Sequence, residues 1–103
     1  MKSETTPRFD NDYRALPIEH RRLFRAVIPA FSAACDGYVA DQGGFVWPGS
    51  LRARRMVGAP RVWEMTWSYA SPDGRATFEF VDLADGSRIR WRRIGSHRVF
   101  QDP

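Results

Sequence analysis

Large apolar residues alternate with smaller or polar ones over residues 62–69 of this chain. Trp63, Met65, Trp67 and Tyr69 share one phase of the alternation, and a period of two residues is typical of a strand buried on one face. The same period returns over residues 76–81, where alanine and phenylalanine take the inward positions. The pattern therefore predicts two neighbouring strands, each with one face in the core.

The segment between these strands, residues 70–74, reads Ala-Ser-Pro-Asp-Gly. Proline and glycine supply the backbone angles of a tight turn, which predicts an antiparallel hairpin. Arg75 then lies at the mouth of the second strand, where its side chain can stand clear of the core. A further turn at residues 84–87 leads to a third strand over residues 88–94. Alternation in that strand predicts that Ile89 and Trp91 face the core and that Arg88, Arg90 and Arg92 face outward.

A different period covers the first half of the chain. Apolar residues recur at spacings of three and four over residues 24–38, which predicts one face of a long amphipathic helix. Leu16-Pro17 resembles a helix start, and Pro29 is expected to kink or split the helix. The residues expected on its solvated side are His20, Arg21, Arg22 and Arg25.

Together these elements predict a single α+β domain over residues 1–103, with N-terminal helices packed on a small antiparallel sheet of three to four strands. A chain of 103 residues with 43% hydrophobic residues fits one domain with a modest core. Residues 1–8 carry no pattern, so we expect either a short edge strand or a loose tail. The end of the chain, residues 95–103, leaves no room for a further helix.

Composition restricts the cellular setting. No apolar run approaches the length of a membrane-spanning helix, and the polar residues 1–6 lack the apolar stretch of a signal peptide. We therefore expect a cytoplasmic protein with no membrane partner. The single cysteine, Cys35, excludes an internal disulfide and lies among apolar residues, which favours a buried thiol over a nucleophile.

Positive charge is concentrated in the second half of the chain. The net charge is +4 and the isoelectric point about 10.0, yet the first fifty residues carry as many acidic as basic side chains. All basic residues except Lys2 are arginines, and the guanidinium group binds phosphate bidentately and stacks on bases. A genome rich in G and C also favours arginine codons, but that bias does not explain the clustering. The distribution favours an anionic partner.

Five short motifs follow one another after the predicted helix. They are Leu51-Arg52-Ala53-Arg54-Arg55, Val62-Trp63-Glu64-Met65, Gly74-Arg75, Trp91-Arg92-Arg93-Ile94-Gly95 and Ser96-His97-Arg98-Val99-Phe100. In this order the chain resembles the RelE/ParE superfamily of type II toxins over residues 9–100, and the RelE and HigB branches in particular. That resemblance implies a toxin that cleaves messenger RNA on the ribosome and is neutralised by a cognate antitoxin, an acidic or helix-turn-helix protein.

The resemblance implies an endoribonuclease that uses no metal or other cofactor. The 2′-hydroxyl attacks the adjacent phosphate and leaves a 2′,3′-cyclic phosphate and a 5′-hydroxyl, which requires a proton acceptor, a proton donor and positive charge at the phosphate. Arg75 matches the arginine assigned to the scissile phosphate. His97 stands where the family places a basic or histidine residue, and it can give or take a proton; a surface histidine at the strand end is the alternative. Glu64 is a second candidate base, although its outward place suits a cross-strand ion pair with an arginine equally well.

The same resemblance assigns further residues to RNA binding. They are Arg52, Arg54, Arg55, Arg93, Arg98 and Phe100. A solvated basic loop is the alternative for the first three. Phe100 can stack on a base, but it lacks the hydroxyl of the tyrosine that stands near this position in the family. The four tryptophans are assigned mainly to the core.

Two other functions remain open at this stage. The ParE branch of the same superfamily inhibits gyrase and is not a nuclease. The chain can also be a basic module that binds RNA or a protein without catalysis, because a phosphate-binding surface looks alike with or without turnover.

Overall fold

The computed structural model describes residues 1–69, 73–83 and 86–103. The elements in chain order are β1 (Ser3–Thr5), α1 (Pro7–Ala15), α2 (Ile18–Ala40), the 3₁₀ helix η1 (Gly49–Leu51), β2 (Arg54–Met56), β3 (Ala59–Ser68), β4 (Gly74–Leu83), β5 (Gly86–Gly95) and the 3₁₀ helix η2 (His97–Gln101). The α+β fold class is confirmed. The turns predicted at residues 70–74 and 84–87 fall partly outside the described residues.

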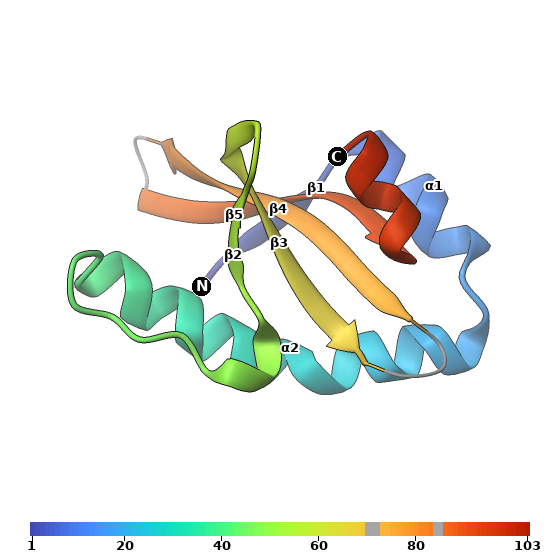
Figure 1. Ribbon diagram of the computed structural model, residues 1–103, viewed down its shortest axis with the longest axis horizontal. Helices are drawn as coiled ribbons and strands as arrows, with labels where there is room; N and C mark the ends of the chain where they lie inside the picture. Colours follow the sequence, from blue (N-terminus) through green and yellow to red (C-terminus); the bar gives the residue numbers. More distant parts are fainter. Residues whose placement is uncertain (70–72, 84–85) are drawn as a thin grey trace.

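The described strands form one five-stranded sheet in the order β1-β5-β4-β3-β2 (Figure 1). All neighbours are antiparallel except β1, which pairs with β5 in parallel. The sheet therefore has one strand more than the upper end of the prediction. Both β1 and β2 are three residues long, too short for alternation to show in the sequence. The edge-strand interpretation of residues 1–8 is confirmed by β1.

Sequence analysis missed α1, since Phe9 is its only buried residue. Its start nevertheless carries the usual signals, because Pro7 occupies the first turn and the Thr6 hydroxyl accepts a hydrogen bond from the Phe9 main-chain N–H at 3.1 Å. An ion pair also holds the C-terminal segment against α1. Arg8 lies 2.6 Å from Asp102 and lowers the pKa of that carboxyl through a direct hydrogen bond.

The long helix is confirmed as α2, and Pro29 does not split it, because the helix is continuous from Ile18 to Ala40. Pro29 is exposed, so water can bind the carbonyl that the missing proline N–H leaves without a partner. By length and composition alone α2 could also cross a membrane, contrary to the sequence expectation. In this fold it is a core helix, with Phe31 and Cys35 almost fully covered.

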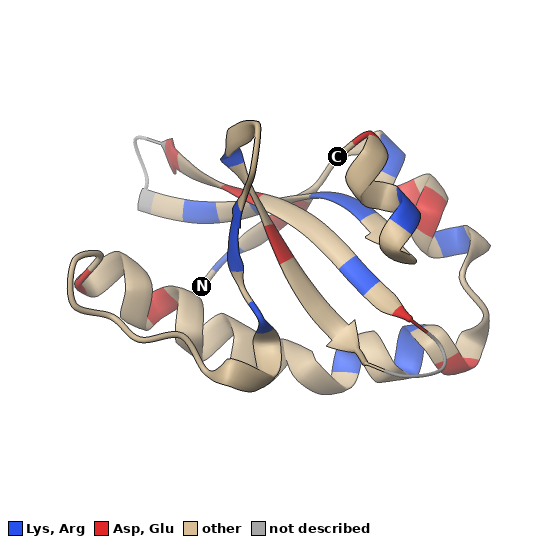
Figure 2. Cartoon of the chain, in the orientation of Figure 1, with Lys and Arg blue, Asp and Glu red and all other residues tan. Residues whose placement is uncertain are grey.

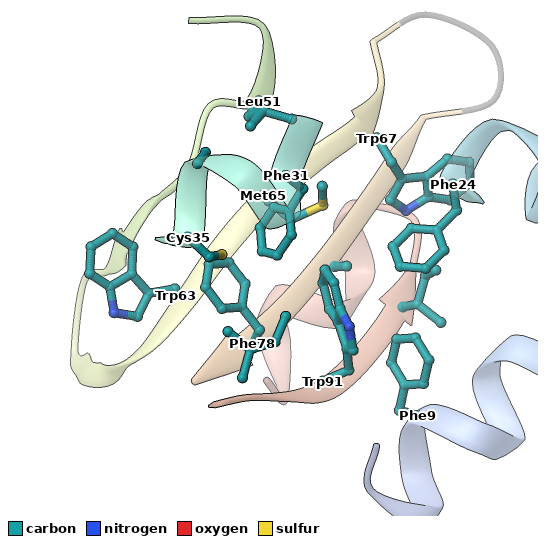
Figure 3. Close-up of a cluster of buried hydrophobic side chains, with 14 of the residues drawn as sticks. Phe9, Phe24, Phe31, Cys35, Leu51, Trp63, Met65, Trp67, Phe78 and Trp91 are labelled. Atoms are coloured by element: carbon teal, nitrogen blue, oxygen red, sulfur yellow. The ribbon is translucent and has the colours of Figure 1, made fainter. Parts of the chain in front are cut away.

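Aromatic side chains from the helices and the sheet form the core (Figure 3). The ring of Phe31 on α2 lies 4.9 Å from the rings of both Phe78 and Trp91. The predicted inward phase is confirmed for Trp63, Met65 and Trp67, which are all buried, but it was wrong for Tyr69, which follows the end of β3 and is exposed. Cys35 is buried as predicted, and that burial raises the pKa of its thiol to about 12.

The end of the chain contains a short helix that the sequence analysis excluded. Ser96 caps η2 by accepting a hydrogen bond from the Arg98 main-chain N–H at 3.4 Å. Val99 anchors η2, being only 6% exposed. The exclusion was wrong because a single 3₁₀ turn needs one buried side chain and a cap rather than an amphipathic repeat.

Candidate functional site

The sheet face turned away from α2, called the open face below, carries the polar side chains of the strands. On β4 these are Arg75, Thr77 and Glu79, which alternate with the buried residues Ala76 and Phe78. Figure 2 shows charged residues distributed along the central strands. The last residues of the chain cover part of this face. Pro103 does so directly, because its carbonyl accepts a hydrogen bond from the Thr77 hydroxyl at 3.3 Å.

Arg75 is the second residue of β4 and lies at one end of the open face, opposite Thr66 on β3 and Gly95 on β5. Its Nη1 donates to the carbonyl oxygens of Ser68 at 2.9 Å and Gly74 at 3.0 Å, and it lies 2.7 Å from Asp73 Oδ1. The side chain is 16% exposed. A guanidinium held in this way has a fixed position, and a phosphate that binds it competes with the Asp73 carboxylate.

Asp73 connects Arg75 to the start of η2. While Asp73 Oδ1 pairs with Arg75, its Oδ2 accepts a hydrogen bond from the His97 main-chain N–H at 3.2 Å. The exposed imidazole of His97 lies against the half-buried ring of Phe100, with 5.1 Å between ring centroids. The structure therefore brings Arg75, His97 and Phe100 to one end of the open face.

Glu64 lies farther along the same face, in the middle of β3. It stands opposite Thr77, one diagonal step from Arg75, and such neighbours are roughly 7–8 Å apart. The cross-strand ion pair considered from the sequence is present, since Glu64 accepts a hydrogen bond from Nε of Arg54 on β2. To accept a proton as a base, the Glu64 carboxylate must first break or share its ion pair with Arg54.

The basic motif at residues 51–55 is not a uniform loop. Leu51 is buried, Arg52 adopts a left-handed backbone conformation with φ 46°, and Arg54 and Arg55 belong to β2. The guanidinium of Arg52 lies 4.9 Å from the ring centroid of Tyr69. All three arginines of the motif are exposed.

Arg93 has different surroundings from the other arginines. Its Nε donates to Asp12 Oδ2 at 2.6 Å and its Nη2 to Asp12 Oδ1 at 3.2 Å, so it fastens α1 to β5. The hydrogen bond to Asp12 raises the pKa of the guanidinium above its ordinary value. Arg98, by contrast, is exposed, and its guanidinium contacts no carboxylate among the described residues.

A network of ion pairs neutralises the arginines of β5. Glu79 accepts hydrogen bonds from Arg90 at 3.1 Å and from Arg92 at 3.3 Å. Glu4 on β1 accepts a second bond from Arg90 at 3.1 Å and lies 3.6 Å from Arg88. These contacts raise the pKa of Arg90, the Glu4 hydrogen bond contributing most. The outward direction of these arginines was predicted correctly, but their carboxylate partners were not.

Sequence reasoning missed four acidic residues that organise this surface. They are Glu4, Asp12, Asp73 and Glu79. The alternation of β4 was a usable signal for Glu79, whereas the other three depend on contacts between distant segments. In the part of the chain that the structure describes, no three His, Cys, Asp or Glu side chains gather as metal ligands would.

Comparison with known proteins identifies the fold. No family model and no curated protein matches the sequence. Among solved structures, a YoeB/ParE toxin from Agrobacterium tumefaciens is similar, with a TM-score of 0.56 and 12% identity over 94% of this chain and 99% of the other. The structure of a RelB-RelE antitoxin-toxin complex from Methanococcus jannaschii matches with a TM-score of 0.54 and 14% identity over 96% and 95% of the two chains. A conserved hypothetical protein from Helicobacter pylori matches with a TM-score of 0.51 and 17% identity over 95% and 96%.

Proposed function

We propose that this chain, which has the RelE/ParE-like fold, is the toxin component of a type II toxin-antitoxin system and cleaves messenger RNA on the ribosome. The observation that carries the proposal is the junction of Arg75, Asp73 and His97 at one end of the open face. The Asp73 carboxylate pairs with the Arg75 guanidinium and accepts a hydrogen bond from the His97 main-chain N–H, so a positioned cation and a histidine meet at the same end of the sheet. Both are components that transesterification of RNA requires.

In the proposed reaction the 2′-oxygen attacks the neighbouring phosphorus and the bond from phosphorus to the 5′-oxygen breaks. Arg75 stabilises the negative charge that develops on the phosphate oxygens, and the main-chain contacts that fix its guanidinium reduce the cost of orienting it. His97 transfers a proton at the reacting oxygens, and Glu64 is the second group able to accept the proton of the 2′-hydroxyl. Phe100 supports the His97 ring and offers a stacking surface for a base.

RNA backbone binding is proposed for Arg52, Arg54, Arg55 and Arg98, which are all exposed. The proposal leaves Arg93 out, because both its Nε and its Nη2 are engaged by Asp12. A cognate antitoxin is proposed as the protein partner, since one of the similar structures is a toxin bound to its antitoxin. The site of action is the cytoplasm, where ribosomes translate messenger RNA.

One observation favours a second function, binding without cleavage. Arg75 and Glu64 both form ion pairs within the protein, with Asp73 and Arg54 respectively. If these pairs persist when RNA arrives, the open face binds polyanions but does not turn them over. Inhibition of gyrase, the activity of the ParE branch, is the outcome to examine if RNA stays intact.

The test is messenger RNA cleavage in a reconstituted bacterial translation reaction, with new 5′ ends mapped by primer extension. We expect cuts within the ribosomal A site with the parent protein, and loss of those cuts with His97→Gln and Arg75→Ala. His20→Gln is the matched control, because it removes the other histidine of the chain, which lies on α2 with its ring 6.1 Å from Trp67. Intact RNA with every protein would contradict the nuclease, and a supercoiling assay with gyrase would follow.

A further inference from the structure

The sheet opens at the end opposite Arg75, because β3 and β4 separate there. Their pairing begins at Trp63 and Phe78 and runs toward Ser68 and Gly74, so residues 59–62 of β3 have no partner on β4. β4 continues along β5 instead, as far as the pair Leu83 and Gly86. Figure 1 shows the β2–β3 hairpin and the far end of β4 and β5 pointing in different directions.

A cavity of about 430 Å³ occupies this opening and is called the fork pocket below. Its size lies within the range of about 300–1,000 Å³ that is usual for small-molecule sites. The β2–β3 hairpin supplies Arg55 and Arg61 to one wall, and β4 supplies Glu79 and Asp82 to the other. Aromatic residues complete the lining. They are Tyr38, Trp63 and Phe80.

The hairpin wall holds positive charge without carboxylate partners. Among the described residues, neither Arg55 nor Arg61 lies within ion-pair distance of an acidic group. Arg55 is nevertheless held in place, because its guanidinium lies 5.4 Å from the ring centroid of Trp63 and its Nη2 donates to the Tyr38 hydroxyl at 3.3 Å. Two exposed arginines, of which Arg55 is held in position, form a suitable site for a phosphate group.

The opposite wall carries acceptors and an aromatic surface. Phe80 is half-buried and its ring stacks on Tyr38 with 5.1 Å between centroids. Next to it, the exposed Asp82 accepts a hydrogen bond from the Ser87 hydroxyl at 2.6 Å through Oδ1. Carboxylates accept hydrogen bonds from the amino groups of nucleobases, and aromatic side chains stack on the faces of unpaired bases.

We propose that the fork pocket binds one unpaired nucleotide, with its phosphate on Arg55 and Arg61 and its base between Phe80 and the carboxylate of Asp82. A base with an exocyclic amino group, namely guanine, cytosine or adenine, fits this wall, whereas uracil lacks the amino donor. An acidic peptide is the less suitable occupant, because its carboxylates would approach Glu79 and Asp82 at close range.

This inference rests on the proposed function, because that function identifies RNA as the source of the nucleotide. Glu79, at the edge of the pocket, is four residues from Arg75 along β4, a distance of about 13 Å at the usual rise of a strand. Phe80 and Asp82 alternate onto the opposite face from Glu79 and Arg75, so a single strand of RNA that contacts both sites must cross the unpaired edge of β4 between them. The pocket would then select a base that lies more than one nucleotide from the cleavage position.

The experiment is a titration of the uniformly ¹⁵N-labelled full chain, followed by two-dimensional NMR. The probes are the 3′-monophosphates of guanosine, cytidine, adenosine and uridine, with ribose 5-phosphate and inorganic phosphate as probes that lack a base. Polyglutamate serves as the acidic polypeptide probe. We expect shifts at the amides of Arg61, Phe80 and Val81 and at the indole N–H of Trp63. Affinity for the three amino-bearing nucleotides should exceed that for the uridine nucleotide and for phosphate by about tenfold, the usual value of one specific base contact.

Two variants separate the walls of the pocket. Arg61→Ala should weaken all the phosphate probes together, whereas Asp82→Ala removes the acceptor and should weaken the amino-bearing nucleotides relative to the uridine nucleotide. The control is Arg22→Ala, an exposed arginine on α2, which should change nothing. The proton spectrum of each variant verifies that it is folded.

Three results would overturn the inference. They are equal affinity for inorganic phosphate and nucleotides, shifts that map away from the fork pocket, and shifts caused by polyglutamate but not by nucleotides, which would make the pocket a site for an acidic protein. Nucleotide binding is measured without ribosomes or cleavage. Its failure is therefore distinct from failure of the proposed nuclease.

Discussion

The contact between Asp12 and Arg93 yields a quantitative prediction about how α1 is held on the sheet. Asp12 accepts two hydrogen bonds from Arg93 and a third from the Ile94 main-chain N–H at 3.2 Å. Each of the two side chains is only 20% exposed. Asp12→Ala therefore removes three bonds and leaves a guanidinium and a main-chain N–H without this acceptor.

Hydrogen bonds to charged groups contribute roughly 1.5–3 kcal/mol, and partial exposure lowers the sum, so we expect Asp12→Ala to reduce the free energy of unfolding by about 3 kcal/mol. Arg93→Ala keeps the Ile94 bond but removes both bonds to Asp12 and the exposed bond from Nη1 to the Asp102 carbonyl at 3.0 Å, and it should cost about 2 kcal/mol. Because both variants break the same pair, the double variant should cost about 1.5 kcal/mol less than the sum of the two.

The assay is urea unfolding at pH 7 followed by tryptophan fluorescence, for the parent, both single variants and the double variant. Arg22→Ala is the control, since the ion pair of Arg22 with Glu19 joins side chains that are 68% and 75% exposed and should contribute less than about 0.5 kcal/mol. If the stability losses of the two single variants add strictly in the double variant, Asp12 and Arg93 do not stabilise each other. An Arg93→Ala protein of parental stability with weakened RNA binding would also contradict this stabilisation, and it would make Arg93 an RNA contact instead.

Three further predictions concern the core and the site. Trp67 is 4% exposed and its indole donates to the Arg75 carbonyl at 3.0 Å, so Trp67→Ala should lower the free energy of unfolding by about 3–5 kcal/mol in urea titrations. Cys35, with a folded-state pKa of about 12, should not react with an aromatic disulfide reagent at pH 8 until the protein unfolds. Burial raises the folded-state pKa of Cys35 above its unfolded-state value of about 8.5, so the protonated thiol stabilises the fold below that pH and loses this effect as the pH rises toward 12. The parent should therefore lose stability more steeply than Cys35→Ala between about pH 9 and 11. Equal slopes for the two proteins would contradict this. Arg75→Lys keeps the charge but not the planar fork, so it should remain folded by circular dichroism yet cleave RNA at least about tenfold more slowly; parental activity would remove Arg75 from the site.

The strands that build the open face were predictable because their alternation survives in the sequence. Trp63, Met65 and Trp67 all face the core as the period of two predicted, and that phase also placed Glu64 outward. By contrast, α1 has one buried side chain, so it carries no apolar period, and only its cap at Thr6 could have indicated it.

The arrangement of the site depends on contacts that a single sequence does not encode locally. Asp73 precedes Arg75 by two positions, but its contact with His97 spans 24 residues and requires η2 to fold back over the end of β4. The fork pocket depends in the same way on where the pairing of β3 with β4 stops. A bulge between Thr66 and Ser68 likewise shifts the register without leaving a signal in the alternation.

Mass spectrometry of the RNA fragments from the translation reaction reveals whether messenger RNA is cleaved by attack of its own 2′-hydroxyl. We expect a 2′,3′-cyclic phosphate on the upstream fragment and a 5′-hydroxyl on the downstream one, with both absent when His97→Gln replaces the parent protein. Fragments that carry a 3′-hydroxyl and a 5′-phosphate, or an RNA that stays intact with the parent, would contradict this mechanism.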